Sequence, residues 1–559
     1  MQKILKLFSR EYVNVNQAAL LLGSFTFLSQ ILALFRDRFI AHFIGPSASL
    51  DVYYTAFRVP DLIFISIASL ASITVLIPFI VEKMNGDTVT DSARKLLNDV
   101  FTVFFFVIVA VSVLFFFIMP YLVPLVAPGF TEAMQEKVIL FSRIMLLSPI
   151  LLGLSNLFGT VTQLFRKFFL YSLSPVFYNI GIIIGVVFLS PIFGINGLVF
   201  GVVLGALMHF VIQAFASSGC GFTIKFAKQI DFKNIKRIAL TSFPRTLGLS
   251  FNSMVLIAIV AFASYFTSGS ISIFNLSFNL QSVPLNIIGI SYAVAAFPTL
   301  VKSFSGKKDG EFKNHLKSTA RQIVFWSLPV IFLFIVLRAQ IVRVILGSES
   351  FSWDNTRLVA ASLAIFSVSV LAQGMVALLS RAYYAIGNTK RPLLINLVSS
   401  VFIVFLSYFF IKIFQTVPLF RYFIESLLKV TDIKGTEVLM LPLAYSVGTI
   451  LNFILQWFFI KKDFMKGESF ITKTFFQSLG ASFVLGVVTY ASLNLLSPVF
   501  GTTTFWGIFL QGFISGILGI FAGVAMLYLL KNEELKDLIE TLKSKFWRAK
   551  VLISPQEEL

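Results

Sequence analysis

The first long apolar run, QAALLLGSFTFLSQILALFRDRFIAHFIG (residues 17–45), decides the fold class, because it is long enough to cross a bilayer and still holds three consecutive charges. Arg36, Asp37 and Arg38 form this charged group. Charged side chains inside a membrane span are costly, so they are retained where they face a protein interior or a water-filled cavity. The run therefore predicts a membrane helix that carries part of a substrate site.

The composition extends this prediction to the whole chain. Of 559 residues, 57% are hydrophobic and 13% are charged, and the mean hydropathy is +0.89, which is typical of a polytopic membrane protein. The 45 Lys and Arg outnumber the 26 Asp and Glu, but they lie in short loops and indicate membrane topology rather than nucleic-acid binding. Cys220 is the single cysteine and the three histidines are scattered, so we expect no disulfide, metal site or cofactor.

We expect an all-α protein with fourteen transmembrane helices, because fourteen apolar stretches are long enough to span a membrane. Their cores lie at 17–45, 52–82, 99–127, 138–164, 168–192, 195–219, 239–266, 271–301, 320–346, 356–386, 392–415, 438–460, 474–496 and 504–530.

The loops predict how these spans are oriented. Basic residues gather in alternate loops, for example between Lys225 and Arg237 and between Lys461 and Lys473, and such loops are cytoplasmic. An even number of spans then places both termini in the cytoplasm. The basic tail at 531–559 is expected to lie as an amphipathic helix along the anionic inner leaflet. No small-residue cleavage site precedes the first span, so no removable signal peptide is expected.

The chain repeats itself at a spacing of roughly 220 residues, which is too long for a solenoid unit. Val59-Pro60 corresponds to Val283-Pro284, and Pro175 corresponds to Pro392. Six spans per copy give both copies the same orientation, as in parallel-repeat transporters. We therefore predict two six-helix lobes around a central cavity and a separate C-terminal helix pair. The predicted domains are 1–220, 221–462, 463–530 and 531–559.

Enzymatic machinery is not visible in the sequence. Gly306-Lys307 lacks the preceding glycine that a phosphate-binding P-loop requires, and the scattered histidines offer no base for a nucleophile. The chain is therefore predicted not to be an enzyme.

Three further charged residues are candidates for a substrate site. Asp51 and Arg58 are seven residues apart, which would place them on one face of the second span; the alternative is a salt bridge near the outer interface. Arg245 follows Pro244 at the start of the seventh span, where it could also be an anchor at the cytoplasmic rim. Carboxylates such as Asp37 and Asp51 are expected to pair with these arginines.

An arginine-rich cavity suits a phosphate-bearing substrate, because the guanidinium group donates two charge-assisted hydrogen bonds to phosphate oxygens. Asn275, Asn279 and Gln281 on the eighth span add neutral polar groups. Asparagines at this depth also commonly join helices to one another, and the sequence leaves both roles open.

These residues resemble the MurJ (MviN) family of lipid II flippases in the MOP exporter superfamily. The resemblance covers nearly the whole chain and rests on five stretches in the family's order. They are Phe35-Arg36-Asp37, Leu50-Asp51-Val52-Tyr53-Tyr54-Thr55-Ala56-Phe57-Arg58-Val59-Pro60, Ala127-Pro128-Gly129-Phe130, Phe243-Pro244-Arg245-Thr246-Leu247-Gly248-Leu249 and Arg381-Ala382-Tyr383-Tyr384-Ala385-Ile386-Gly387-Asn388-Thr389.

The resemblance implies a cationic cavity between two lobes and a transporter that works by alternating access in the bacterial inner membrane. Its substrate would be an undecaprenyl-pyrophosphate-linked disaccharide-pentapeptide, which it would move to the outer leaflet for peptidoglycan synthesis. The family's site residues carry over to Arg36, Asp37, Asp51 and Arg245. Membrane lipids are the other expected partners, nucleic acid is not, and we expect a monomer.

The family's charge pattern is incomplete in this sequence. Gln30, Phe64 and Asn279 stand where family members often have arginine, and Ile259 stands where some have an acid that helps to form a sodium site. No coupling ion is therefore assigned.

The last two spans are predicted to hold the hydrocarbon tail of a lipid substrate, which must stay in apolar surroundings. Small residues could wall such a groove, although glycines at these spacings also permit close helix packing. The candidate residues are Gly480, Gly486, Gly512 and Gly516.

The sequence leaves other functions open. The first alternative is a MOP-superfamily flippase for another polyprenyl-linked oligosaccharide. A MATE-type antiporter would usually have twelve spans and an acidic cavity, so the extra helix pair argues against it. A non-transporting scaffold with a decayed flippase fold is the last alternative.

Overall fold

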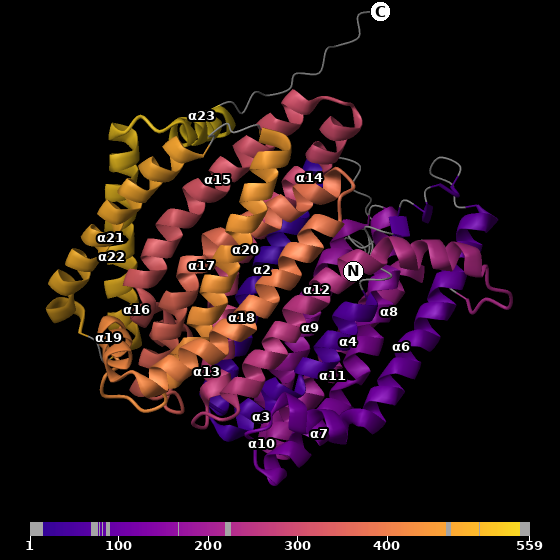
Figure 1. Cartoon of the computed structure of the whole chain (residues 1–559), viewed down its shortest axis with the longest axis horizontal. Coiled ribbons are helices and arrows are strands. Elements are labelled where there is room, and N and C mark those ends of the chain that lie inside the picture. The colour runs from indigo at the N-terminus through magenta and orange to yellow at the C-terminus, as the bar shows by residue number, and fades with distance from the viewer. Residues whose placement is uncertain are drawn as a thin grey trace, which may run out of the picture. The chain divides into compact units, whose positions relative to one another are not determined.

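The structure is a computed structural model in which nearly every described segment is helical (Figure 1). It describes residues 15–68, 76–77, 79–80, 82–84, 90–165, 167–218, 225–465, 471–501 and 504–547. The longer helices of the first half are α2 (Val15–Phe43), α3 (Ala48–Ala56), α4 (Arg58–Ala68), α6 (Asp91–Val126), α7 (Glu132–Met145), α8 (Leu147–Leu164), α9 (Phe168–Ile184), α11 (Ile195–Ser218), α12 (Phe232–Ala263) and α13 (Ser270–Pro284).

The second half continues in the same way. Its helices are α14 (Ser291–Ser305), α15 (Asp309–Val336), α16 (Arg338–Leu346), α17 (Trp353–Ala385), α18 (Lys390–Thr416), α19 (Pro418–Leu428), α20 (Met440–Ile460), α21 (Thr472–Phe500), α22 (Phe505–Leu529) and α23 (Glu533–Trp547). Short elements complete the order, namely η1 (Gly185–Leu189), α10 (Ser190–Phe193), η2 (Leu285–Ile290), η3 (Thr436–Leu439) and η4 (Lys461–Met465).

The prediction of an all-α polytopic membrane protein is confirmed. In the described part of the chain, 12 helical segments are long and apolar enough to cross a membrane. The exact count of fourteen stays a prediction. The 29-residue helix α2 occupies the first predicted span, and the second begins with α3 and α4 before it reaches residues outside the described part.

The chain folds into two compact units. The first contains Met1–Val283, Val342–Ser369 and Gly387–Gln456, and the second contains Pro284–Ile341, Val370–Ile386 and Trp457–Leu559. Each unit combines segments that are distant in the sequence. The predicted boundaries at 220, 462 and 530 stay predictions.

Close glycine contacts join α9 and η1 to α11 in the first unit. The sequence places glycines four residues apart on both sides of the contact, at Gly181 and Gly185 and at Gly201 and Gly205. A Cβ atom added to Gly201 would lie 2.5 Å from the Cα atom of Gly185, and one on Gly181 would lie 2.3 Å from that of Gly205. Because nothing larger than hydrogen fits there, the two backbones approach as in small-residue membrane helix pairs.

Two helices of the first unit are interrupted next to prolines. The predicted second span is not one helix, because α3 ends at Ala56 and α4 begins at Arg58. Pro60 has no N–H to donate to the carbonyl of Ala56, and the Ser142 hydroxyl donates to that oxygen instead at 3.1 Å. The fourth predicted span is divided in the same way: α7 ends at Met145, and α8 begins at Leu147, two residues before Pro149.

The second unit is built on α15, α21 and α22, and the C-terminal helix α23 docks onto it (Figure 1). Phe325, Ala481, Leu527 and Leu535 form its buried apolar cluster.

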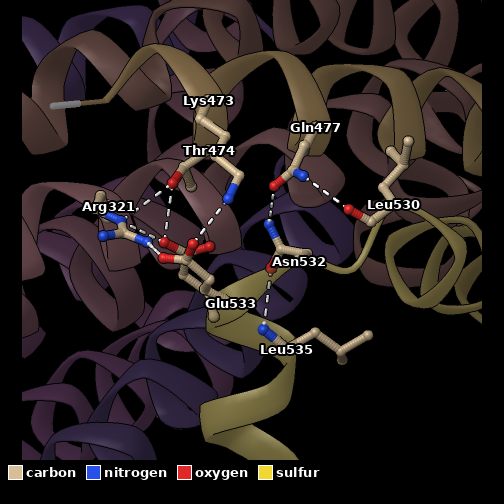
Figure 2. Close-up of polar contacts among 9 residues, drawn as sticks. Arg321, Lys473, Thr474, Gln477, Leu530, Asn532, Glu533 and Leu535 are labelled. Atoms are coloured by element: carbon tan, nitrogen blue, oxygen red, sulfur yellow. Dashed lines mark hydrogen bonds and ion pairs between the residues drawn. The ribbon is translucent and has the colours of Figure 1, made fainter. Parts of the chain in front are cut away.

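Polar contacts hold the first turn of α23 in place (Figure 2). Arg321 on α15 donates to Glu533 and Glu534, each at 2.5 Å, and Lys473 on α21 donates to Glu533 at 2.7 Å. The side-chain nitrogen of Asn532 donates a hydrogen bond to the side-chain oxygen of Gln477 at 2.9 Å. The start of the predicted tail is therefore packed on the protein, while its contact with the inner leaflet stays a prediction.

Candidate functional site

Helix α13 presents three polar residues to the charged residues of α2, α3 and α4. Ser272, Asn275 and Asn279 follow one another at spacings of three and four, so they share one face of the helix. We call them the α13 polar face. Each of the three binds a different charged residue of the first unit.

Asp51 binds the N-terminal end of α13. The Gly269 N–H donates to Oδ2 at 2.6 Å, and the N–H and hydroxyl of Ser272 donate to Oδ1 at 2.7 and 2.6 Å. The Asp51 side chain is buried, and its charge lies where the unpaired N–H groups of the helix favour an anion. Within the described residues the expected pairing of Asp51 with an arginine is not found, because this carboxylate is satisfied by backbone and hydroxyl donors.

Arg36 and Asp37 form an ion pair beside the other end of the α13 polar face. Arg36 donates to Asp37 Oδ1 from Nε at 3.0 Å and from Nη2 at 2.8 Å. Asn279 donates to Asp37 Oδ2 at 3.1 Å. The Arg36 side chain is 20% exposed and that of Asp37 is 3% exposed, so the arginine is the more accessible partner of this pair.

Asn179 on α9 completes this group and was missed by the sequence reasoning. Its side-chain oxygen accepts from Arg36 Nη1 at 3.2 Å, while its amide nitrogen donates to the Ser29 hydroxyl at 3.2 Å. The signal was one asparagine in an apolar span, four residues after Pro175, to whose carbonyl it also donates. This pattern alone does not separate a site residue from one that joins helices.

Arg58 lies in the middle of the α13 polar face. Its Nη2 donates to the side-chain oxygen of Asn275, and its buried Nε has no hydrogen-bond partner. The break at Phe57 places Arg58 on α4 and Asp51 on α3, so the two residues do not lie on one continuous helix. Both residues nevertheless contact the same helix, α13.

Of the other two predicted arginines, only Arg38 has a described side chain, and it has structural partners. Arg38 donates to the last carbonyls of α16, those of Val344 at 2.6 Å and Ile345 at 3.2 Å, as a cation at a helix C-terminus does. Arg245 belongs to α12, but its side chain lies outside the described residues. Its convergence with Arg36 therefore stays a prediction.

The glycines of the predicted tail groove lie in the second unit. A Cβ atom on Gly486 would meet Phe332 at 3.0 Å, one on Gly512 would meet Gln340 at 3.1 Å, and one on Gly516 would meet Leu337 at 3.3 Å. These three glycines take part in close packing, which was the alternative to a role in a lipid-tail groove. A Cβ atom on Gly480 would meet nothing within 4 Å, and a tail groove stays a prediction.

The geometry defines what the α13 group can do. The α13 group consists of the charged residues beside the α13 polar face, namely Arg36, Asp37, Asp51 and Arg58. Because two arginines are matched by two carboxylates, the group is close to neutral and inexpensive to keep in a membrane protein. The Nε and Nη2 edge of Arg36, which could bind a phosphate through two hydrogen bonds, is occupied by Asp37. A phosphate would therefore have to displace this carboxylate.

Comparison with known proteins places the chain among lipid transporters. Residues 40–420 match the family model described as lipid II flippase MurJ. A probable lipid II flippase MurJ from Buchnera aphidicola subsp. Baizongia pistaciae (strain Bp) is 22% identical over 417 residues, which cover 72% of this chain and 79% of the relative. The lipid II flippase MurJ of Burkholderia cenocepacia is 23% identical over 492 residues, covering 86% of this chain and 91% of the relative.

Solved structures show the same fold. A lipid II flippase MurJ in an inward closed conformation superimposes with a TM-score of 0.72 at 22% identity, covering 93% of this chain and all of that one. An inward-facing multidrug resistance MATE transporter of the MOP superfamily has a TM-score of 0.58 at 14% identity, covering 79% of this chain and 96% of the other.

Proposed function

This chain belongs to the MurJ family, and from that premise we propose that it moves lipid II from the inner to the outer leaflet of the bacterial inner membrane. The substrate is a disaccharide-pentapeptide carried on undecaprenyl pyrophosphate, and the product supplies peptidoglycan synthesis. Both termini lie in the cytoplasm, in agreement with the basic loops. The transport needs no covalent chemistry.

The observation that supports this proposal most is the partly exposed Arg36 in an otherwise buried polar group. Asp37, Asp51 and Arg58 are buried, whereas Arg36 combines a fixed position with partial exposure. A fixed arginine suits the pyrophosphate group of the substrate, because a planar guanidinium donates two parallel hydrogen bonds to phosphate oxygens.

We infer that substrate binding is an exchange of anions on Arg36. In the substrate-free protein Asp37 neutralises the arginine, which reduces the cost of its charge in the membrane. An arriving phosphate takes over the Nε and Nη2 edge, and Asp37 keeps its second contact, the 3.1 Å bond from Asn279. When the substrate leaves, Asp37 rebinds Arg36 and favours release.

The proposal can be tested with the full-length protein. Expression in a bacterium depleted of its own lipid II flippase should restore growth and cell shape. The purified protein in vesicles should expose fluorescent lipid II to an external reagent faster than empty vesicles do. Failure of both assays with well-folded protein would contradict the proposal. Transport of another polyprenyl-linked oligosaccharide, with no effect on lipid II, would identify a related flippase instead.

A further inference from the structure

Asp61 on α4 is an intramembrane carboxylate that neither the α13 group nor the transport proposal uses. It lies within the predicted second span, where an ionisable residue requires a partner or a function. Its side chain is exposed, and it makes no hydrogen bond or ion pair within the described part of the chain. Arg58, three residues earlier on the same helix, attracts Asp61 electrostatically, but its Nη2 hydrogen bond goes to Asn275 of α13 and it makes no direct ion pair with Asp61.

A small pocket of the first unit adjoins Asp61. Its volume is about 20 Å³, and a single water needs about 10–15 Å³. Ser148 on α8 and Tyr178 on α9 line it together with Asp61. The pocket therefore has room for one water-sized species.

Ser148 shows that a polar occupant would be accommodated. Its side chain is 6% exposed, and its buried hydroxyl has no hydrogen-bond partner. A buried hydroxyl without a partner costs free energy unless something binds it. Ser148 and Asp61 line the same pocket, and both side chains carry oxygen atoms that can bind a cation.

The backbone around the pocket supplies further oxygen. Pro60 and Pro149 line it, and each interrupts the hydrogen bonding of its helix. The carbonyl freed by Pro60, that of Ala56, is taken by Ser142. Pro149 cannot donate to the carbonyl of Met145, a pocket residue, which is therefore left without its α-helical donor. Interrupted membrane helices bind Na⁺ through carbonyls freed in this way.

We propose that this pocket is a binding site for a monovalent cation of the size of Na⁺, held by the carboxylate of Asp61, the hydroxyl of Ser148 and the carbonyl of Met145. A divalent ion does not fit this donor set, because Ca²⁺ takes six to eight oxygen ligands and usually several carboxylates. In the described residues no group of three or more His, Cys, Asp or Glu could hold a metal. A bound monovalent cation would neutralise Asp61 within the membrane.

The test measures cation binding without any lipid substrate, so its outcome is independent of the transport proposal. Full-length protein in detergent is titrated with ²²Na⁺ at pH 7.5, with choline chloride keeping the ionic strength constant. Saturable binding of one ion per chain is expected. Sodium should also raise the thermal midpoint Tm by about 2 °C when it is well above its Kd.

Three variants make the test specific. Asp61→Asn should weaken sodium binding at least tenfold, and Ser148→Ala, which preserves the packing, should weaken it several-fold. Glu136→Gln, a substitution at an exposed position on α7, should leave it unchanged. Wild-type binding by both Asp61→Asn and Ser148→Ala would overturn the proposal. So would equal stabilisation by sodium and choline, or a site that responds only to pH and therefore binds a proton.

Discussion

At the scale of single residues, Arg36 and Asp51 show how similar sequence signals lead to different roles. Both are charges within or beside apolar runs, yet Arg36 is partly exposed and paired with one carboxylate, whereas Asp51 is buried and saturated by three donors. The first is suited to exchanging partners. The second holds α3 against the start of α13.

Replacing Arg36 should remove transport. We expect Arg36→Ala to abolish lipid II flipping in vesicles and Arg36→Lys to retain at most part of it, because lysine offers a point charge instead of a planar fork. Expression and thermal stability are measured in parallel. Equal rates for Arg36→Ala and the unsubstituted protein at matched expression would refute the role of Arg36.

Replacing Asp51 should mainly affect stability. Asp51→Ala removes the acceptor for three donors at the α13 N-terminus, and we expect a loss of about 2–4 kcal/mol in the free energy of unfolding. Asp51→Asn keeps the shape and one acceptor oxygen, so it should lose less. Thermal unfolding checks both variants. Unchanged stability in Asp51→Ala would show that these contacts contribute little.

The residue scale also shows where sequence reasoning reaches its limit. Arg36 and Asp37 were recognisable because charge is rare in an apolar run. The partners of Asp51 were not, because spacing cannot show that a carboxylate meets a helix that begins more than 200 residues later. Asn179 was missed because a single asparagine in a membrane helix is equally consistent with helix packing.

At the scale of elements, long apolar runs were sufficient to predict most helices, but the interruptions at Phe57 and Leu146 were not predicted. The prolines that cause them were visible in the sequence. Whether a proline breaks a membrane helix depends on what satisfies the freed carbonyl, and for Ala56 that partner is Ser142 on another helix. Such partners are known only once the helices are packed.

The contact of α9 and η1 with α11 should not tolerate larger residues. Gly201→Val places side-chain atoms on the backbone of Gly185, and we expect it to lower the free energy of unfolding by at least about 2 kcal/mol. Gly23→Ala is the matched control, because a Cβ atom there would meet nothing within 4 Å. A Gly201 variant as stable as the Gly23 variant would disprove the close packing.

The docking of α23 should depend on pH in one direction only. Hydrogen bonds from Lys473 and Arg321 lower the pKa of Glu533 to about 2, below the ordinary carboxyl value. Because the pKa of Glu533 is lower in the docked state, the stabilisation that its carboxylate gives to docking is complete above about pH 4.5. This stabilisation is lost as the pH falls toward 2. A spin label on α23 should therefore report docking from pH 8 to 5 and release in stronger acid, and Glu533→Gln should weaken docking even at pH 7. Release between pH 7 and 5 would contradict this assignment.

At the scale of the whole molecule, the C-terminal helices are part of a packed unit and not an appendage. Helices α21 and α22 contact each other and α15, and α23 closes the same unit through Arg321. The sequence repeat had left these helices without a counterpart, and only the spatial contacts show which segments they stabilise.

Truncation should therefore disrupt more than a lipid groove. We expect a protein ending after Lys473 to lose flipping and to unfold at a lower temperature, because α15 loses the helix packed along it. Removal of residues 548–559 alone is the control and should leave both properties unchanged. If the protein truncated after Lys473 flips lipid II normally, the C-terminal pair has no role in transport.

The bond from Ser142 to the carbonyl of Ala56 also has a consequence for biosynthesis. Its two partners are 86 residues apart, so the ribosome must add that many residues before the donor exists. At about 5–20 residues per second this takes roughly 4–17 s. During that interval the nascent second span carries an unsatisfied carbonyl that hydrocarbon cannot solvate. The insertion machinery must therefore retain this segment in a hydrated or protein-lined place until the fourth span arrives, and the two segments enter the bilayer as partners.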